Sequence, residues 1–117
     1  MGSAPDPEAT GALTPAEISV KTSAGQRGWI VVVKGEVDIA TSPELRRQLE
    51  RLTDDDEPIV VDVTEMSFID SSGLGVLVEV LKHRREAGAG AVALRGMQEP
   101  VRRVFEITGL TDLFELE

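Results

Sequence analysis

Apolar residues in several parts of the chain follow patterns that are typical of β-strands. Apolar and polar side chains alternate in EISVKT at residues 17–22, and GWIVVVKG at 28–35 is a β-branched run. The turn-forming residues between them favour a hairpin. IVVDV at 59–63 is short and continuously apolar, as in a central strand covered on both faces. AVALRG at 91–96 and LFELE at 113–117 predict two further strands.

Three other segments show the period of an α-helix. Residues 40–52 predict a helix with Ser42 as N-cap, followed by a proline that the first turn tolerates. A second helix begins at the Ser-Ser-Gly stretch after residue 70 and ends near Ala87, before Gly88. Residues 99–109 predict a third, ended by glycine. The expected inward positions are Leu45, Leu49 and Leu52 in the first helix, and Val101, Val104, Phe105 and Thr108 in the third.

This order of elements predicts an α/β fold. We expect a mixed β-sheet of about five strands, with at least one parallel pair and three or more helices packed against it. Residues 1–15 contain three prolines and two glycines without apolar periodicity, so we expect a flexible N-terminal tail. At 117 residues in all, the remaining segment 16–117 is expected to form one domain.

Composition excludes several classes of function. The net charge of −9 disfavours binding to nucleic acid or anionic lipid, and the acidic run 54–57 reads as a solvated loop. The chain has no cysteine and one histidine, His83, so we expect neither a disulfide nor a metal site. No apolar run reaches the roughly 18 residues that span a bilayer, and no signal peptide is evident. We therefore expect a cytoplasmic protein without membrane insertion.

The stretch MSFIDSSGLGVL at residues 66–77 carries the candidate chemistry. If Ser71 or Ser72 were an acyl-transfer nucleophile, it would need a base within hydrogen-bonding reach. His83 follows Ser71 by 12 residues on the same predicted helix, which places it roughly 18 Å away along the axis. The stretch also lacks the Gly-x-Ser-x-Gly pattern. The sequence therefore does not favour a hydrolase.

Two other roles for the stretch stay open. Gly73 and Gly75 at a helix start could admit a phosphate, but position 78 is valine, no P-loop lysine follows, and Asp70 would face the anion. In the simplest structural role, Asp70 or Ser71 caps the helix and the glycines allow close approach to the preceding strand.

The helical wheel of this segment adds a second question. Val76 and Val80 fall on the side opposite the expected core, near Ser72 and His83, so we expect them to face solvent or a partner. Isolated exposed valines are common, and both outcomes remain open. The expected core positions are Leu74, Leu77, Val78 and Leu81.

Three segments resemble the anti-sigma factor antagonist family, whose members are small single STAS domains. They are GEVDIATSPEL at 35–45, IVVDVTEMSFIDSSGLGVLV at 59–78 and VRRVFEITGLTDLFEL at 101–116. The likeness covers essentially residues 16–117, and DSSGLG after an apolar strand is its most specific part.

The resemblance implies a partner-switching protein that is not an enzyme. The unphosphorylated antagonist would bind an anti-sigma factor, a serine kinase with a histidine-kinase-like ATPase fold, and so release a sigma factor. The kinase would phosphorylate Ser71, the first hydroxyl after the aspartate, and a metal-dependent PP2C-type phosphatase would reverse this. Asp38 matches a family acidic position near this loop.

The candidate partner-binding residues, with no cofactor or metal, are Asp38, Asp70, Ser72, Gly73, Gly75, Val76 and Val80. The glycines would keep side-chain bulk out of an incoming enzyme's way. Two alternatives remain: a STAS scaffold or transporter-associated module without phosphorylation, and a nucleotide-binding STAS domain.

Overall fold

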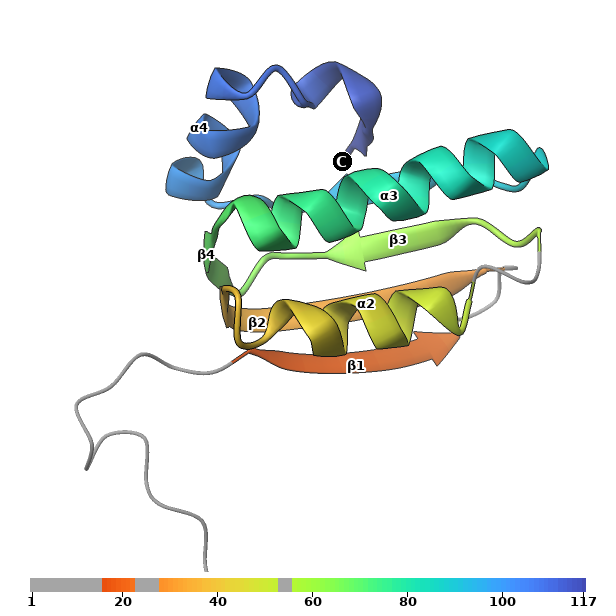
Figure 1. The fold of residues 1–117 in the computed structure, drawn as a ribbon, viewed down its shortest axis with the longest axis horizontal. Coiled ribbons are helices and arrows are strands. Elements are labelled where there is room, and N and C mark those ends of the chain that lie inside the picture. Colours follow the sequence, from red (N-terminus) through yellow and green to blue (C-terminus); the bar gives the residue numbers. More distant parts are fainter. Residues whose placement is uncertain (1–15, 23–27, 53–55) are drawn as a thin grey trace, which may run out of the picture.

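The computed structural model describes residues 16–22, 28–52 and 56–117 (Figure 1). The predicted tail, most of the hairpin turn and part of the acidic run lie outside these ranges. None of the helices in the described ranges is long and apolar enough to cross a membrane.

A mixed sheet of six strands forms the centre of the fold. The path along the sheet is β1 (Glu17–Thr22), β2 (Trp29–Val37), β3 (Ile59–Asp62), β5 (Val92–Arg95) and β6 (Glu115–Leu116), with β4 (Met66–Ile69) paired to β2 off this path. Of these described strands, β1 alone is antiparallel to its neighbour, and the other pairs are parallel. The predicted mixed sheet is confirmed.

The sixth strand, β4, is the one that the sequence did not separate from the apolar run before it. It continues the parallel pairing along the second half of β2, after a shift in register between Gly35 and Glu36. Gly35 has φ +86°, a conformation that favours glycine, and its N–H donates to the Glu65 carbonyl oxygen at 2.9 Å. β2 thus pairs first with β3 and then with β4.

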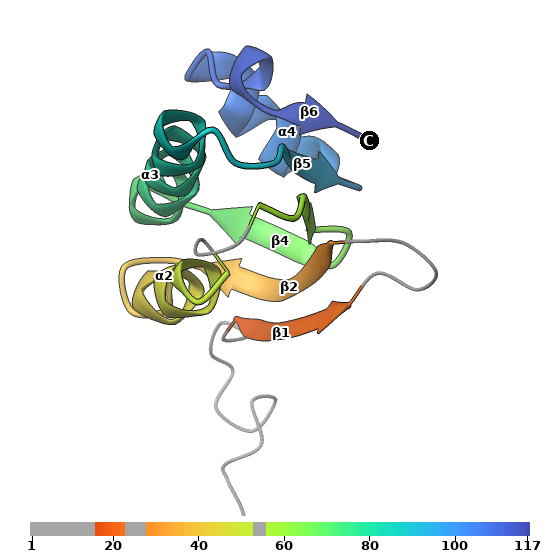
Figure 2. The same ribbon diagram turned by 90° about the vertical axis from the view of Figure 1, so that its right-hand side faces the viewer.

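In the part of the chain that the structure describes, three α-helices flank the sheet: α2 (Ser42–Glu50), α3 (Ser71–Ala87) and α4 (Glu99–Ile107). A 3₁₀ turn, η1 (Thr111–Leu113), precedes β6. Helices α2 and α3 lie side by side on the same face of the sheet (Figure 1, Figure 2). The predicted ends of α3 and α4 are confirmed, because Gly88 has φ +70° and Gly109 has φ +74°.

Two local expectations about helix ends are wrong. The N-cap of α2 is Thr41, and Ser42 is a buried first residue of the helix. Thr108 is exposed because it lies just beyond α4, as its C-cap, where its hydroxyl donates to the Val104 carbonyl oxygen at 2.8 Å.

The core lies between the sheet and the pair α2 and α3. Valines and isoleucines of β2 and β3 pack there against helix leucines, and each fully buried side chain of this kind contributes about 1.5–3 kcal/mol. Phe105 of α4 and Phe114 form an edge-to-face pair with ring centroids 6.0 Å apart, which joins the C-terminal segment to the core. The predicted leucine stripe of α2 is confirmed.

The expectation that Val76 and Val80 face solvent is wrong: their exposed fractions are 2% and 5%. The expected core positions Leu74, Leu77 and Leu81 are buried as predicted, but Gly73, Val76, Val80 and Arg84 are buried as well, so the buried face is wider than expected. The reason is that α3 has neighbours on two sides, the sheet and α2, and therefore buries a wide arc. Val78, which we expected in the core, is only half-buried.

Candidate functional site

Two loops meet where α2 and α3 begin. Val37 ends β2, Ile69 ends β4, and the two residues lie opposite each other in parallel register. The Asp70 N–H donates to the Val37 carbonyl oxygen at 3.1 Å. The segments that follow, 38–41 and 70–72, therefore leave the sheet side by side at one edge of the molecule (Figure 1).

Asp70 caps α3. Its Oδ1 accepts hydrogen bonds from the Ser72 N–H at 2.9 Å, the Gly73 N–H at 3.3 Å and the Ser72 hydroxyl at 2.5 Å. The hydrogen bond from the Ser72 side chain, followed by those from the backbone, lowers the pKa of the Asp70 carboxyl. Asp70 is therefore a charged N-cap at neutral pH, and its predicted capping role is confirmed.

The two adjacent serines differ in accessibility and in bonding. Ser72 is half-buried, and its hydroxyl donates to Asp70. Ser71 is exposed, and its hydroxyl has no hydrogen-bond partner among the residues that the structure describes. Of the pair, Ser71 alone presents a hydroxyl that an approaching enzyme could reach without breaking an internal bond.

The two glycines of this stretch have different surroundings. A Cβ placed on Gly73 would lie 2.7 Å from the Cγ1 atoms of both Ile69 and Val37, so this glycine lets α3 sit directly on β2 and β4. Gly73 is buried, and the expectation that it faces a partner is wrong. A Cβ on Gly75 would meet nothing within 4 Å, so Gly75 does face open space.

Asp38 organises the neighbouring loop. Its Oδ1 accepts from the Ala40 N–H at 3.0 Å, the Thr41 N–H at 3.1 Å and the Thr41 hydroxyl at 3.1 Å. The Thr41 Oγ1 also accepts from the Asp38 N–H at 2.9 Å. This turn fixes the loop and leaves the Ile39 side chain 80% exposed.

Ile39 and Thr41 are residues that the sequence analysis did not select. The available signal was a large apolar residue directly after the turn-forming Asp38, outside any periodic pattern. An isoleucine that is 80% exposed next to the Ser71 loop is a candidate contact for another protein.

Within the described ranges, the groups of a hydrolytic site are not assembled around these serines. His83 is exposed on α3, 12 residues beyond Ser71 on the same helix. Among the described residues, no three histidine or acidic side chains lie close enough together to hold a metal ion.

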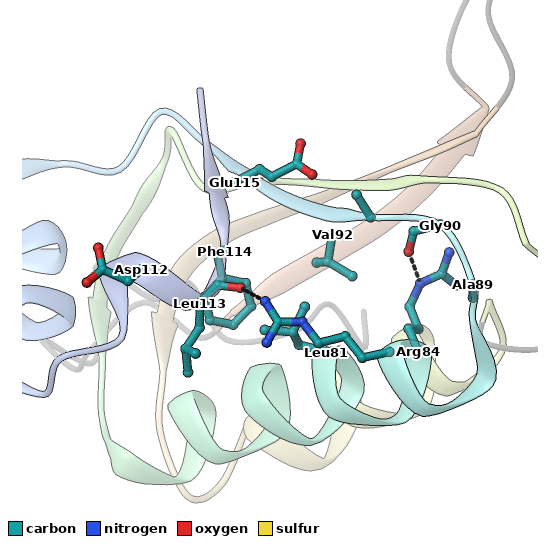
Figure 3. A pocket seen from close by; sticks show the side chains of 11 residues that line it. Leu81, Arg84, Ala89, Gly90, Val92, Asp112, Leu113, Phe114 and Glu115 are labelled. Atoms are coloured by element: carbon teal, nitrogen blue, oxygen red, sulfur yellow. Dashed lines mark hydrogen bonds between the residues drawn. The ribbon is translucent and has the colours of Figure 1, made fainter.

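A cavity of ≈ 190 Å³ lies near the other end of α3, between that helix, the start of β5 and the C-terminal segment (Figure 3). Its two arginines bond to main-chain carbonyl oxygens. Arg84 donates to Gly90 at 3.0 Å, and Arg85 donates to Leu113 at 3.0 Å (Figure 3). These guanidinium groups therefore hold segments of the chain together.

Comparison with known proteins places the chain in a family. The STAS domain profile matches residues 17–117. An anti-sigma-B factor antagonist of Listeria monocytogenes is 40% identical over 89 residues, which is 74% of this chain and 76% of the relative. The corresponding Bacillus subtilis antagonist is 31% identical over 99 residues, covering 85% of this chain and 90% of the relative.

A solved structure agrees with these sequence relatives. The crystal structure of an anti-sigma factor antagonist from Mycobacterium paratuberculosis has a TM-score of 0.71 and 28% identity, and it covers 86% of this chain and 84% of that one. The chain therefore belongs to the STAS domain family and, within it, to the anti-sigma factor antagonists.

Proposed function

We propose that this protein is an anti-sigma factor antagonist that binds an anti-sigma factor serine kinase when Ser71 is unmodified. Phosphorylation of Ser71 by that kinase then ends the binding. The observation that supports this proposal is the contrast between an exposed, unbonded Ser71 hydroxyl and the bonded Ser72 hydroxyl beside it.

The proposed reaction is a phosphoryl transfer from a nucleoside triphosphate held by the kinase. Ser71 Oγ forms a bond to the γ-phosphorus, and the bond from that phosphorus to the β,γ-bridging oxygen breaks. The nucleoside diphosphate leaves, and the hydroxyl proton passes to a base on the kinase. A PP2C-type phosphatase would return Ser71 by hydrolysis, releasing inorganic phosphate.

The position of Ser71 suits such a modification. It is the first residue of α3, where the helix dipole and the N–H groups of the first turn tolerate an anion. Its exposed side chain allows the phosphate to stay in water, so the fold should persist.

The same phosphate would oppose binding. It adds about −1.5 to −2 charges next to the ionised Asp70 carboxylate, on a chain whose net charge is already −9. Desolvating that charge in an interface is costly, and a nucleotide-loaded kinase would repel it. The proposed switch therefore acts through charge at the interface.

The surface around Ser71 defines the proposed contact. Along α3, Ser71, Gly75 and Val78 follow one another on the outward side, at spacings of four and three residues. Ile39 lies on the adjoining loop, at the N-terminal end of this row of residues. We propose that these four residues, rather than Val76 and Val80, meet the kinase.

The test compares Ser71→Ala, Ser71→Asp and the unchanged protein as baits in an extract of the source cells. The Ser71→Ala protein should retain the kinase with or without ATP, and the unchanged protein should release it after ATP is added. Ser71→Asp should bind weakly. Ser67→Ala, on the exposed side of β4, is the matched control and should behave as the unchanged protein. Kinase-dependent phosphate that persists in Ser71→Ala would contradict the proposal.

A further inference from the structure

We propose that Asp70 determines which of the two adjacent serines is phosphorylated, by holding the Ser72 hydroxyl so that only Ser71 can accept the phosphate. This inference rests on the proposed function. It assigns to Asp70 a positioning role in addition to capping.

The Ser72 hydroxyl is held against Asp70 by a convergent set of hydrogen bonds. Ser72 Oγ lies 2.5 Å from Asp70 Oδ1, and the same oxygen accepts the Ser72 and Gly73 N–H groups at 2.9 Å and 3.3 Å. Because all three bonds converge on one carboxylate oxygen, turning the Ser72 side chain toward an incoming phosphate would break the charge-assisted bond of the set. Ser71 breaks no such bond when it reacts.

The two possible phosphorylated products differ in the surroundings of the phosphate. A phosphate on Ser72 would be a dianion on an oxygen that lies in contact with an ionised carboxylate. It would also have to leave a half-buried position to reach water. A phosphate on Ser71 is in water from the start, since that side chain is exposed.

Asp70 could also have the opposite effect on Ser72. A carboxylate that accepts a hydroxyl proton could act as a general base and make Ser72 the better nucleophile. However, the bonds from Ser72 and Gly73 lower the pKa of Asp70, which makes it a weaker proton acceptor. The structure therefore favours restraint of Ser72 over its activation, and the two roles predict opposite effects of removing the charge.

The experiment uses the full chain, its cognate kinase and ATP, with the phosphate located by tandem mass spectrometry. Asn is as good an N-cap as Asp, so Asp70→Asn keeps the helix start and removes only the charge. In Ser71→Ala, Ser72 should take almost no phosphate. In Ser71→Ala with Asp70→Asn, Ser72 phosphorylation should rise at least about tenfold, because a neutral acceptor holds the hydroxyl more weakly.

Asp62→Asn in the Ser71→Ala background is the matched control. The Asp62 Oδ1 accepts hydrogen bonds from the Thr64 N–H at 3.0 Å and the Thr64 hydroxyl at 2.7 Å, but it accepts none from Ser72, so this variant should leave Ser72 unmodified. Far-UV circular dichroism and thermal melting of each variant identify any loss of fold, and Asp70→Ser, another good N-cap without the charge, replaces Asp70→Asn if that variant does not fold.

The outcomes separate the inference from the proposed function. If the unchanged protein takes no phosphate on Ser71, the proposed function fails and the inference fails with it. If Ser71 is phosphorylated normally but Ser72 gains nothing in the Asp70→Asn background, only the inference is overturned. The inference is also overturned if Asp70→Asn abolishes modification of Ser71, since Asp70 would then serve the kinase. Modification of Ser72 in Ser71→Ala alone would contradict both the inference and the proposed function.

Discussion

Arg84 donates its Nε–H to the carbonyl oxygen of Gly90, 3.0 Å away, and so ties the end of α3 to the start of β5 (Figure 3). Its Nη1 also donates to the Leu52 carbonyl oxygen at 3.2 Å, and its Nη2 donates to that of Glu57. Arg84 is only 1% exposed. One buried side chain thus joins α3 to two segments that are distant in sequence.

Replacing Arg84 with methionine should be strongly destabilising. The substitution removes the donors for several carbonyl oxygens in a buried region, and losses of this kind cost about 3–5 kcal/mol. Urea unfolding measures the effect. Arg85→Met is the control. Because Arg85 is exposed, this substitution should lower the free energy of unfolding by about 1 kcal/mol or less. Equal losses for both variants would contradict the structural role given to Arg84.

The two glycines of α3 should respond in opposite directions to alanine. Gly73→Ala would place a Cβ 2.7 Å from two side-chain carbons and should cost about 1–3 kcal/mol by overpacking. Gly75→Ala meets nothing within 4 Å and should stabilise the protein by about 0.5–1 kcal/mol through helix propensity. Thermal melting of both variants checks this. An unchanged melting temperature for Gly73→Ala would contradict this prediction, because it would show that α3 can move away from the sheet.

An aspartate substitution at Ile39 should impair kinase binding, whereas one at Val80 should impair folding. Ile39→Asp changes an exposed side chain, so the free energy of unfolding should shift by less than about 0.5 kcal/mol. We expect its affinity for the kinase to fall at least about tenfold, because the charge would be desolvated in the interface. Val80→Asp buries an unpaired charge and should unfold the domain. Unchanged kinase binding by a folded Ile39→Asp would remove Ile39 from the proposed contact.

The contribution of Asp70 to stability should depend on pH. Its pKa is lower in the folded chain than in the unfolded one, so its stabilising contribution is fully present above the unfolded value of about 3.9. The contribution is lost as the pH falls through the folded pKa. The free energy of unfolding in urea should therefore decrease less between pH 7 and pH 3 for Asp70→Asn than for the unchanged protein. Parallel curves for the two proteins would contradict this.

The sequence predicted most of the elements because their patterns are local. The β-branched runs of β2 and β3, the leucine stripe of α2 and the glycines that end α3 and α4 each determine their element through nearby residues alone. Asp70 as a helix cap belongs to the same class. The strand β4 was missed because it has only four residues and only its two end residues are buried.

The orientation of α3 could not be predicted from its apolar residues. Its buried stripe includes Gly73 and Arg84, which do not count as core residues in a hydrophobicity pattern. Both are buried for tertiary reasons, Gly73 by contact with Val37 and Ile69 and Arg84 by carbonyl groups of distant loops. Without them the pattern selected Val78 and turned Val76 and Val80 outward.

The difference between Ser71 and Ser72 also lay beyond the sequence. Both serines follow Asp70 and both precede Gly73 within two residues, so their local sequence does not distinguish them. The turn at the helix start directs one hydroxyl back to the carboxylate and the other into solvent.

The contact of Gly73 with Val37 and Ile69 leaves α3 no clearance above the sheet. The helix cannot move closer to β2 and β4, or rotate across them, without a steric clash. The two strands therefore fix the position of Ser71 relative to the sheet. If Ser71 is phosphorylated as proposed, a protein that recognises this end of the molecule should meet the same backbone before and after modification. It would then have to distinguish the two forms by its own charges, so the proposed switch would depend on the electrostatics of the partner's surface.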